Sequence, residues 1–247
     1  MWDRVSVAVI VPSYREARIL PRMLARLPAY VDRVFVVDDA SDDGTEAAAR
    51  ASGDARLRVV RHAENRGVGA AIVSGYRAAL AEDLAVLAVM AGDDQMHPDD
   101  LEAVIAPIAR GQADYVKGNR FVHADARRMP ALRRLGGELL SFATRRATGL
   151  AVSDCQCGFT ALSAAVARRL PLDELWPRYG YPNDFLGMLA AHGCSVVEVP
   201  VRPVYADERS GLNALHVPRI LGIIARRYWL ERRRAHSAIA RSTSRSA

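Results

Sequence analysis

The sequence predicts an α/β protein with a mostly parallel β-sheet that is flanked by helices. Short apolar runs alternate with amphipathic stretches long enough for helices, and turn residues separate them. Strands separated by helices of about 10–15 residues are typical of βαβ units. The first five strands are expected at 5–11, 34–37, 57–61, 84–90 and 114–117. Helices are expected between and after them at 17–27, 46–51, 68–81 and 98–110.

Local signals support these elements. In the first helix Ile19, Met23 and Leu27 recur at helical spacing and form one apolar face. Pro98 fits the first turn of the fourth helix, where its missing N–H is not needed. After Gly118 the alternation becomes less regular, and the later elements are expected as helices at 131–148, 182–192 and 218–234 and strands at 159–162 and 196–201.

The 247 residues, half of them hydrophobic, fit one large domain with an extension. We expect this domain to span 1–217, followed by a basic helix at 218–234 and a disordered Ser/Arg-rich tail at 235–247. Three cysteines without framework spacing favour a reduced, cytoplasmic compartment. No apolar run reaches the roughly 20 residues that span a bilayer, so any membrane contact is expected to be peripheral.

The positive charge is concentrated at the C-terminus. From residue 219 onward eight arginines accompany one acid, so this segment carries +7 and the remaining chain −1. This distribution argues against a nucleic-acid groove across the domain and indicates an anionic surface as partner. With Ile220, Ile223 and Trp229 among the arginines, the last helix fits an interfacial helix on an anionic membrane, or one packed on the domain.

Polar clusters follow three of the predicted strands. They are Pro12, Tyr14 and Glu16, then Asp38 and Asp39, then Asp93, Asp94 and Gln95. In an open parallel sheet, ligands bind beyond the carboxyl ends of the strands. A carboxylate can accept a base N–H, a tyrosine ring can stack on a base, and an oxygen cluster suits a divalent cation. The sequence therefore predicts a nucleotide-sugar site.

Six segments carry a family resemblance in the same order. They are Val9–Glu16, Val36–Thr45, Asn65–Ala71, Met90–Pro98, Gly118–Arg120 and Asp154–Phe159. Across about residues 5–165 the chain resembles family-2 glycosyltransferases of the GT-A fold, most of all the dolichyl- and polyprenyl-phosphate mannosyl and glucosyl synthases. The resemblance implies an inverting transfer of mannose or glucose from GDP-mannose or UDP-glucose to a polyprenyl phosphate.

The resemblance also implies roles for donor-side residues. The nucleotide contacts of the family fall on Pro12, Tyr14, Glu16 and one or both of Asp38 and Asp39. A loop at 205–213 resembles the mobile segment that closes over the donor, and its Arg209 would meet the diphosphate.

The metal motif of the family, Asp-x-Asp, departs from the pattern here. It falls on Ala91-Gly92-Asp93, so the first acid is missing, while Asp93 and Gln95 match the direct ligands of Mg²⁺ or Mn²⁺. Magnesium often takes only one or two carboxylates besides phosphates and waters, and Asp94 offers a partial substitute. The missing acid leaves open a nucleotide-sugar binding protein without catalysis.

The acceptor side follows from the same resemblance. Arg120 corresponds to the arginine that grips the acceptor phosphate, and Asp154 would support that side or cap a turn. Arg133 and Arg134 form either a second phosphate grip or a solvated helix face.

The acceptor itself decides whether a base is needed. A lipid phosphate is already anionic, whereas a hydroxyl acceptor on a glycan or small molecule must lose a proton to a carboxylate. Asp184 lies where related hydroxyl-using transferases place that base, although it is also placed as a helix N-terminal acid. The expected catalytic residues are therefore Asp93, Arg120 and Asp184.

Overall fold

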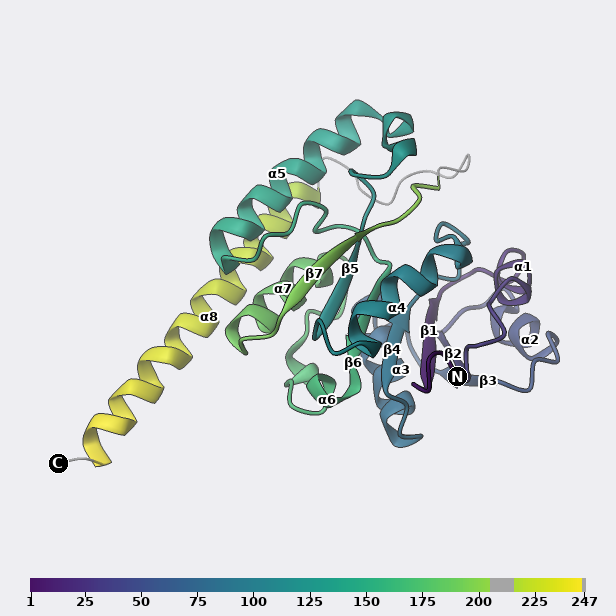
Figure 1. Cartoon of the computed structure of the whole chain (residues 1–247), viewed down its shortest axis with the longest axis horizontal. Coiled ribbons are helices and arrows are strands. Elements are labelled where there is room, and N and C mark those ends of the chain that lie inside the picture. The colour runs from purple at the N-terminus through teal and green to yellow at the C-terminus, as the bar shows by residue number, and fades with distance from the viewer. Residues whose placement is uncertain (205–215, 246–247) are drawn as a thin grey trace.

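The computed structural model describes residues 1–204 and 216–245, without the side chains of 128, 132, 133 and 235–245. One seven-stranded sheet has the order β3-β2-β1-β4-β6-β5-β7 (Figure 1). Its strands are β1 (Val7–Ser13), β2 (Arg33–Asp38), β3 (Leu57–Arg61), β4 (Val86–Val89), β5 (Tyr115–Asn119), β6 (Thr160–Ser163) and β7 (Val196–Pro200). Only β6 runs antiparallel to its neighbours, β4 and β5, which confirms the mostly parallel sheet.

The helices agree with the expected order. They are α1 (Leu20–Ala25), α2 (Thr45–Arg50), α3 (Val68–Ala81), α4 (Leu101–Ala109), α5 (Ala131–Thr148), α6 (Ala164–Ala167), α7 (Tyr181–Ala191) and α8 (His216–Arg245). Short 3₁₀ helices lie at η1 (Pro98–Asp100), η2 (Ala124–Arg128) and η3 (Leu172–Glu174). The sequence did not predict α6, η2 or η3, because they are too short to show a period.

Helices cover both faces of the sheet. One buried core lies between the sheet and α3, α5, α7 and α8, and the other lies between the sheet and α1, α2 and α4. Successive strand side chains alternate between the two, so Val9 faces one core and Ile10 the other. Because both faces are covered, the central strands are continuously apolar, and this made them readable from sequence.

The C-terminal helix packs on the domain along its first half. Ile220, Ile223 and Ile224 are buried, so most of the apolar positions considered for a membrane contact belong to the core. Trp229 is 59% exposed. Helix α8 contacts α5 and α7 and then extends away from the sheet (Figure 1). It continues to Arg245 through the stretch expected to be disordered, where alanines favour helix. Within the described residues no helix is long and apolar enough to cross a bilayer.

Candidate active site

The loop after β1 is anchored to the turn that follows β2. The backbone N–H of Arg15, which has a φ of 59°, donates to Ser41 Oγ at 2.9 Å. The N–H of Glu16 donates to Thr45 Oγ1, also at 2.9 Å. These bonds fix the direction of the intervening side chains, and Tyr14 keeps an exposed ring beside the sheet edge. A ring held in this way offers a stacking surface for a nucleobase.

A cavity of about 300 Å³ opens at the carboxyl ends of β1, β2 and β4. Five predicted residues line it, namely Pro12, Tyr14, Glu16, Asp39 and Asp93. The other lining residues are Ser13, Asn65, Gly67, Val68, Ala71 and Ala91. All six lie inside the motifs quoted above, so the signal was present at the level of the motif. The cavity confirms that strand ends far apart in sequence meet at one edge.

Asp39 is the buried carboxylate of this cavity. Its Oδ2 accepts from Gly67 N at 2.7 Å, and its Oδ1 accepts from Arg66 N at 2.9 Å. His62 Nδ1 lies 2.6 Å from the same Oδ1, and the other ring nitrogen lies 2.9 Å from Ser74 Oγ. The carboxylate thus ties the end of β2 to the loop before α3 and faces the cavity with a fixed geometry.

Asp38 points elsewhere. Its side chain is fully buried, with Oδ1 accepting from Ser41 N at 3.0 Å and Oδ2 paired with Arg61. It does not line the cavity. Of the two aspartates that the resemblance offered for the nucleotide, the geometry places Asp39 at the site and gives Asp38 the role of a turn cap.

The glycines before and within α3 allow a close approach of two backbones. A Cβ on Gly67 would lie 2.6 Å from the carbonyl oxygen of Pro177, and one on Gly69 would lie 2.3 Å from that of Trp176. Ala70 N donates to Pro177 O at 3.1 Å across this contact. The segment before α7 therefore closes one wall of the site against the N-terminus of α3.

The two adjacent aspartates after β4, Asp93 and Asp94, have different surroundings. Asp93 lines the cavity and its Oδ1 accepts from Gln95 N at 3.0 Å. Asp94 adopts a left-handed backbone with φ of 57° and forms ion pairs with Arg22 and Arg26 at 2.6 and 2.9 Å. Because it is already paired outside the cavity, Asp94 does not substitute for the acid missing at position 91.

The residues around Asp93 fit a divalent cation that is shared with a diphosphate. A Cβ on Gly92 would lie 2.1 Å from Glu16 Oε2 and 2.5 Å from Ser13 Oγ, so the Glu16 carboxylate lies directly against this backbone. No cluster of three or more His, Cys, Asp or Glu ligands occurs in the described part of the chain. Mg²⁺ needs only one or two protein carboxylates when phosphates and waters complete its shell, and Asp93 meets that requirement.

A second cavity of about 290 Å³ adjoins the first and shares Pro12, Val68 and Ala91 with it. Its other walls are Val89, Met96, Gln156, Gly158, Tyr179, Gly180, Tyr181 and Pro182. None of the described residues that line it carries a carboxylate or an imidazole. The space next to the first cavity is therefore apolar and aromatic, with one amide.

That amide belongs to Gln156, which the sequence interpretation left without a role. Gln156 Nε2 donates to Asn183 Oδ1 at 2.6 Å, and Asn183 Nδ2 donates to Thr144 Oγ1 at 2.9 Å. Asn183 and Thr144 are buried. A chain of buried polar groups from α5 and α7 thus fixes the orientation of Gln156 at the wall of the cavity.

Arg120 and Asp154 form a buried pair beside β5. The guanidinium donates through Nε and Nη2 to the two carboxylate oxygens at 2.7 and 2.9 Å, and the Asp154 side chain is fully buried. Burial opposes ionisation of Asp154, but the charge and hydrogen bonds of Arg120 outweigh it and lower the pKa of the carboxyl group. Glu198 on β7 accepts from Asp154 N at 2.8 Å and fixes the loop.

Lys117 is a further buried charge that sequence reasoning missed. Its side chain is fully buried on β5, and Nζ donates to Cys157 O at 2.5 Å. Burial lowers the pKa of this amine. A lysine within an otherwise apolar strand was the available signal.

Asp184 does not lie at either cavity. Its carboxylate is fully buried, accepts from Trp176 N at 2.9 Å and forms a bidentate pair with Arg227 at 2.9 and 2.6 Å. A Cβ on Gly187 would lie 2.5 Å from Arg227 Cγ, so the glycine lets the arginine stem cross α7. The geometry therefore contradicts the expected general base, because this carboxylate is sealed between α7 and α8.

The remaining predicted residues lie apart from the cavities or outside the described residues. Arg134 is exposed on α5 and pairs with Glu138 at 2.9 Å, which fits the solvated helix face. The side chain of Arg133 and the whole of Arg209 lie outside the described residues.

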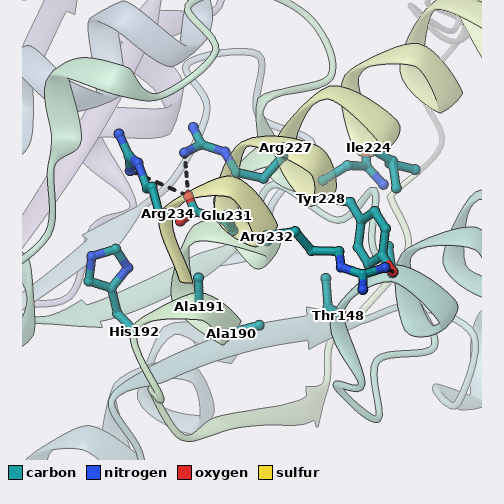
Figure 2. A pocket seen from close by; sticks show the side chains of 13 residues that line it. Thr148, Ala190, Ala191, His192, Ile224, Arg227, Tyr228, Glu231, Arg232 and Arg234 are labelled. Carbon is teal, nitrogen blue, oxygen red and sulfur yellow. Dashed lines mark hydrogen bonds and ion pairs between the residues drawn. The ribbon is translucent and has the colours of Figure 1, made fainter. Parts of the chain in front are cut away.

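A further cavity, of about 510 Å³, lies between α5, α7 and α8 (Figure 2). Its charged lining is engaged internally, since Glu231 accepts from Arg227 at 3.0 Å and lies 3.6 Å from Arg234. It contains none of the strand-end residues described above. We therefore assign it to the packing of the helices.

Comparison of the chain with known protein families shows which family it belongs to. The model described as "Glycosyl transferase family 2" matches residues 8–170, which include every wall of the donor cavity. The chain belongs to glycosyl transferase family 2. The expectation drawn from the six motifs is confirmed.

Known relatives and a solved structure agree with this assignment. The chain is 33% identical over 201 residues to an undecaprenyl-phosphate mannosyltransferase of Micrococcus luteus, covering 79% of this chain and 82% of that protein. It is 27% identical over 225 residues to a UDP-N-acetylglucosamine–dolichyl-phosphate N-acetylglucosaminyltransferase of Methanococcus voltae, covering 84% and 88%. The fold is similar to glucosyl-3-phosphoglycerate synthase from Mycobacterium tuberculosis, crystallised with Mn²⁺, UDP and product, with a TM-score of 0.70, 21% identity and coverage of 91% and 80%. The expected GT-A fold is confirmed.

Proposed function

We propose that this protein is an inverting glycosyltransferase that moves a hexose, mannose or glucose, from a nucleotide sugar to a polyprenyl phosphate at the cytoplasmic face of a membrane. The observation that carries the proposal is the contrast between the two adjoining cavities. The first offers three carboxylates and an aromatic ring, whereas the described walls of the second offer no carboxylate or imidazole that could accept a proton. An acceptor that is already anionic needs no such group.

The donor would bind in the first cavity. Tyr14 supplies a ring for the base, and Asp39 supplies an acceptor for a base or ribose donor. Asp93 would hold a Mg²⁺ or Mn²⁺ ion together with the diphosphate, with Gln95 beside it. The ion would supply charge stabilisation for the leaving nucleoside diphosphate. The relatives named above include users of different donors, so GDP-mannose and UDP-linked sugars both stay candidates.

The acceptor phosphate would enter from the side of β5. Arg120 lies at the end of that strand, and its pairing with Asp154 holds the guanidinium in one orientation. A guanidinium held in one orientation brings its positive charge to a phosphate without further ordering. The phosphate oxygen then attacks the anomeric carbon, the bond to the nucleoside diphosphate breaks, and the configuration inverts. In this scheme catalysis rests on positioning.

Binding and transfer can be measured separately. Thermal unfolding with UDP-glucose, GDP-mannose and UDP-N-acetylglucosamine, each with and without Mn²⁺, tests the donor cavity. A donor at about 100 times its Kd stabilises the native state by about 2.7 kcal/mol, which gives a clear rise in Tm. The preferred donor should then yield a labelled polyprenyl-phosphate sugar in detergent. Donor binding without transfer to any prenyl phosphate would contradict the proposed acceptor.

A further inference from the structure

The outward face of α5 is apolar. Leu135, Leu139 and Phe142 are 64%, 48% and 57% exposed. They are spaced by four and three residues, so they form one stripe along the helix. Such a stripe normally faces a protein core.

The opposite face of the same helix is already buried in the domain. Leu140, Ser141 and Thr144 are fully buried. Ser141 Oγ accepts from Cys155 N at 3.1 Å, and Thr144 Oγ1 accepts from Asn183. The orientation of α5 is therefore fixed by packing, and the apolar stripe cannot turn inward.

The surroundings of the stripe are basic. Residues 121–150 contain six arginines and two acids, a net charge of +4. Of these arginines, Arg127, Arg134 and Arg146 are exposed, and Arg146 lies four residues after Phe142 on the same side of the helix. An apolar stripe with a basic border complements an anionic lipid surface, where apolar burial and charge attraction add.

The helix that carries the stripe also contacts the segment that follows Arg120, through its opposite face. A Cβ on Gly137 would lie 2.9 Å from Phe121 Cζ, so α5 packs on the residue that follows Arg120. Val122, the next residue, is 61% exposed. The expected acceptor contact is therefore joined through Phe121 to the helix that carries the stripe.

We infer that the Leu135–Leu139–Phe142 face of α5 docks this protein on an anionic bilayer, and that α8 does not. This inference rests on the proposed function, because it names the surface from which a lipid phosphate is taken. It replaces the sequence-based expectation for the last helix, whose isoleucines are in the core.

Sedimentation of the full chain with vesicles tests the assignment. The vesicles contain phosphatidylcholine alone or with phosphatidylglycerol, and the variants are the triple L135S/L139S/F142S and, as matched control, Trp229→Ser on α8, a side chain that is 59% exposed. Burial of one such side chain changes binding by about tenfold. We expect the triple variant to lose at least about a hundredfold in affinity for the anionic vesicles and the control less than about tenfold.

Other outcomes overturn the inference. Equal binding by the triple variant, or a loss confined to Trp229→Ser, would reject α5 as the docking surface. Absence of vesicle binding by the wild type, with a dimer that the triple variant abolishes, would assign the stripe to a second copy of the chain. Donor-induced thermal shifts and transfer to a short, water-soluble prenyl phosphate are measured in the same variants. If these fail in the wild type, the proposed function fails while the vesicle result stands on its own.

Discussion

The two ends of the sheet treat their carboxylates differently. In the half built on β1, β2 and β4, Asp39 is held largely by backbone N–H groups and Asp93 accepts from Gln95 N, and both line a cavity. In the half built on β5, β7, α5 and α7, Asp154 and Asp184 are buried and each is bound by a guanidinium. The first half keeps negative charge for a cation and a nucleotide, and the second half neutralises it. This contrast favours an acceptor that arrives already ionised.

The largest expected effect is a loss of stability when the buried pair between Asp184 and Arg227 is broken. Asp184→Asn removes the bidentate partner of the buried Arg227, which keeps its pair with Glu231, and removal of one partner from a buried pair costs about 3–5 kcal/mol in the free energy of unfolding. Urea denaturation measures this loss. Asp83→Asn, at an exposed residue that pairs with Arg168, is the matched control and should change stability little. Unchanged stability combined with a hundredfold loss of kcat would restore Asp184 as a general base.

The donor side should show the opposite behaviour, with activity lost and the fold kept. Asp93→Asn removes the expected metal ligand, and we expect transfer to fall by about a hundredfold or more, because a bound cation contributes several kcal/mol to catalysis. The adjacent Asp94→Asn, which faces Arg22 and Arg26, should keep the response to Mn²⁺. Initial rates across a Mn²⁺ titration distinguish the two. Equal losses in both variants would contradict the assignment of the metal to Asp93 and not to Asp94.

The pH dependence of stability sharpens the account of Arg120. The pKa of Asp154 is lowered, so in the wild type its carboxylate contributes stability above the unfolded pKa of about 3.9, and this is lost as the pH falls through the folded pKa. In Arg120→Met the charge and side-chain hydrogen bonds that chiefly oppose burial are removed, while Lys117 and the backbone N–H of residue 120 remain, so the pKa of Asp154 rises relative to the wild type and the variant gains less stability as the pH rises. The stability difference should widen from about pH 4 to pH 7.

Chemical denaturation at several pH values measures this difference. Arg134→Met, which removes an exposed arginine paired with Glu138, provides a control with little pH dependence. If the stability difference between the wild type and Arg120→Met stays constant from about pH 4 to pH 7, Arg120 does not set the ionisation of Asp154.

The smallest effect is expected at the amide of the second cavity. Gln156→Ala removes one oriented hydrogen-bonding group, which is worth roughly 1 kcal/mol, so kcat/KM should fall by about five- to tenfold with little change in donor affinity. Steady-state kinetics with the preferred donor measures this. A larger loss in donor affinity than in kcat would show that Gln156 contacts the donor and not the acceptor.

Much of the fold was predictable because helices cover both faces of the sheet and bury its strands. The seven strands and the long helices follow from continuous apolar runs and helical periods, since a covered parallel sheet leaves little room for polar positions. The donor site was predictable to the level of motifs, because strand ends of a parallel sheet meet at one edge. The choice between Asp38 and Asp39 was not, since it depends on which carboxylate the following turn captures.

The half of the molecule built on β5, β7, α5 and α7 was less predictable, because its contacts join residues far apart in the sequence. The Asp184–Arg227 pair joins residues 43 positions apart, and no local pattern indicates that α8 folds back over α7. Both α5 and α8 carry apolar positions at helical spacing, yet packing buries the three isoleucines of α8 and leaves Leu135, Leu139 and Phe142 of α5 exposed. Periodicity identifies an amphipathic helix, but it does not say what its apolar face contacts.

The most direct measurement compares two acceptors of equal chain length, a polyprenyl phosphate and the corresponding polyprenol, with the same labelled nucleotide sugar and Mn²⁺. The account predicts transfer to the phosphate and none above background to the alcohol, because no carboxylate among the described walls of the second cavity can take the hydroxyl proton. Transfer to the alcohol at a comparable rate would contradict it.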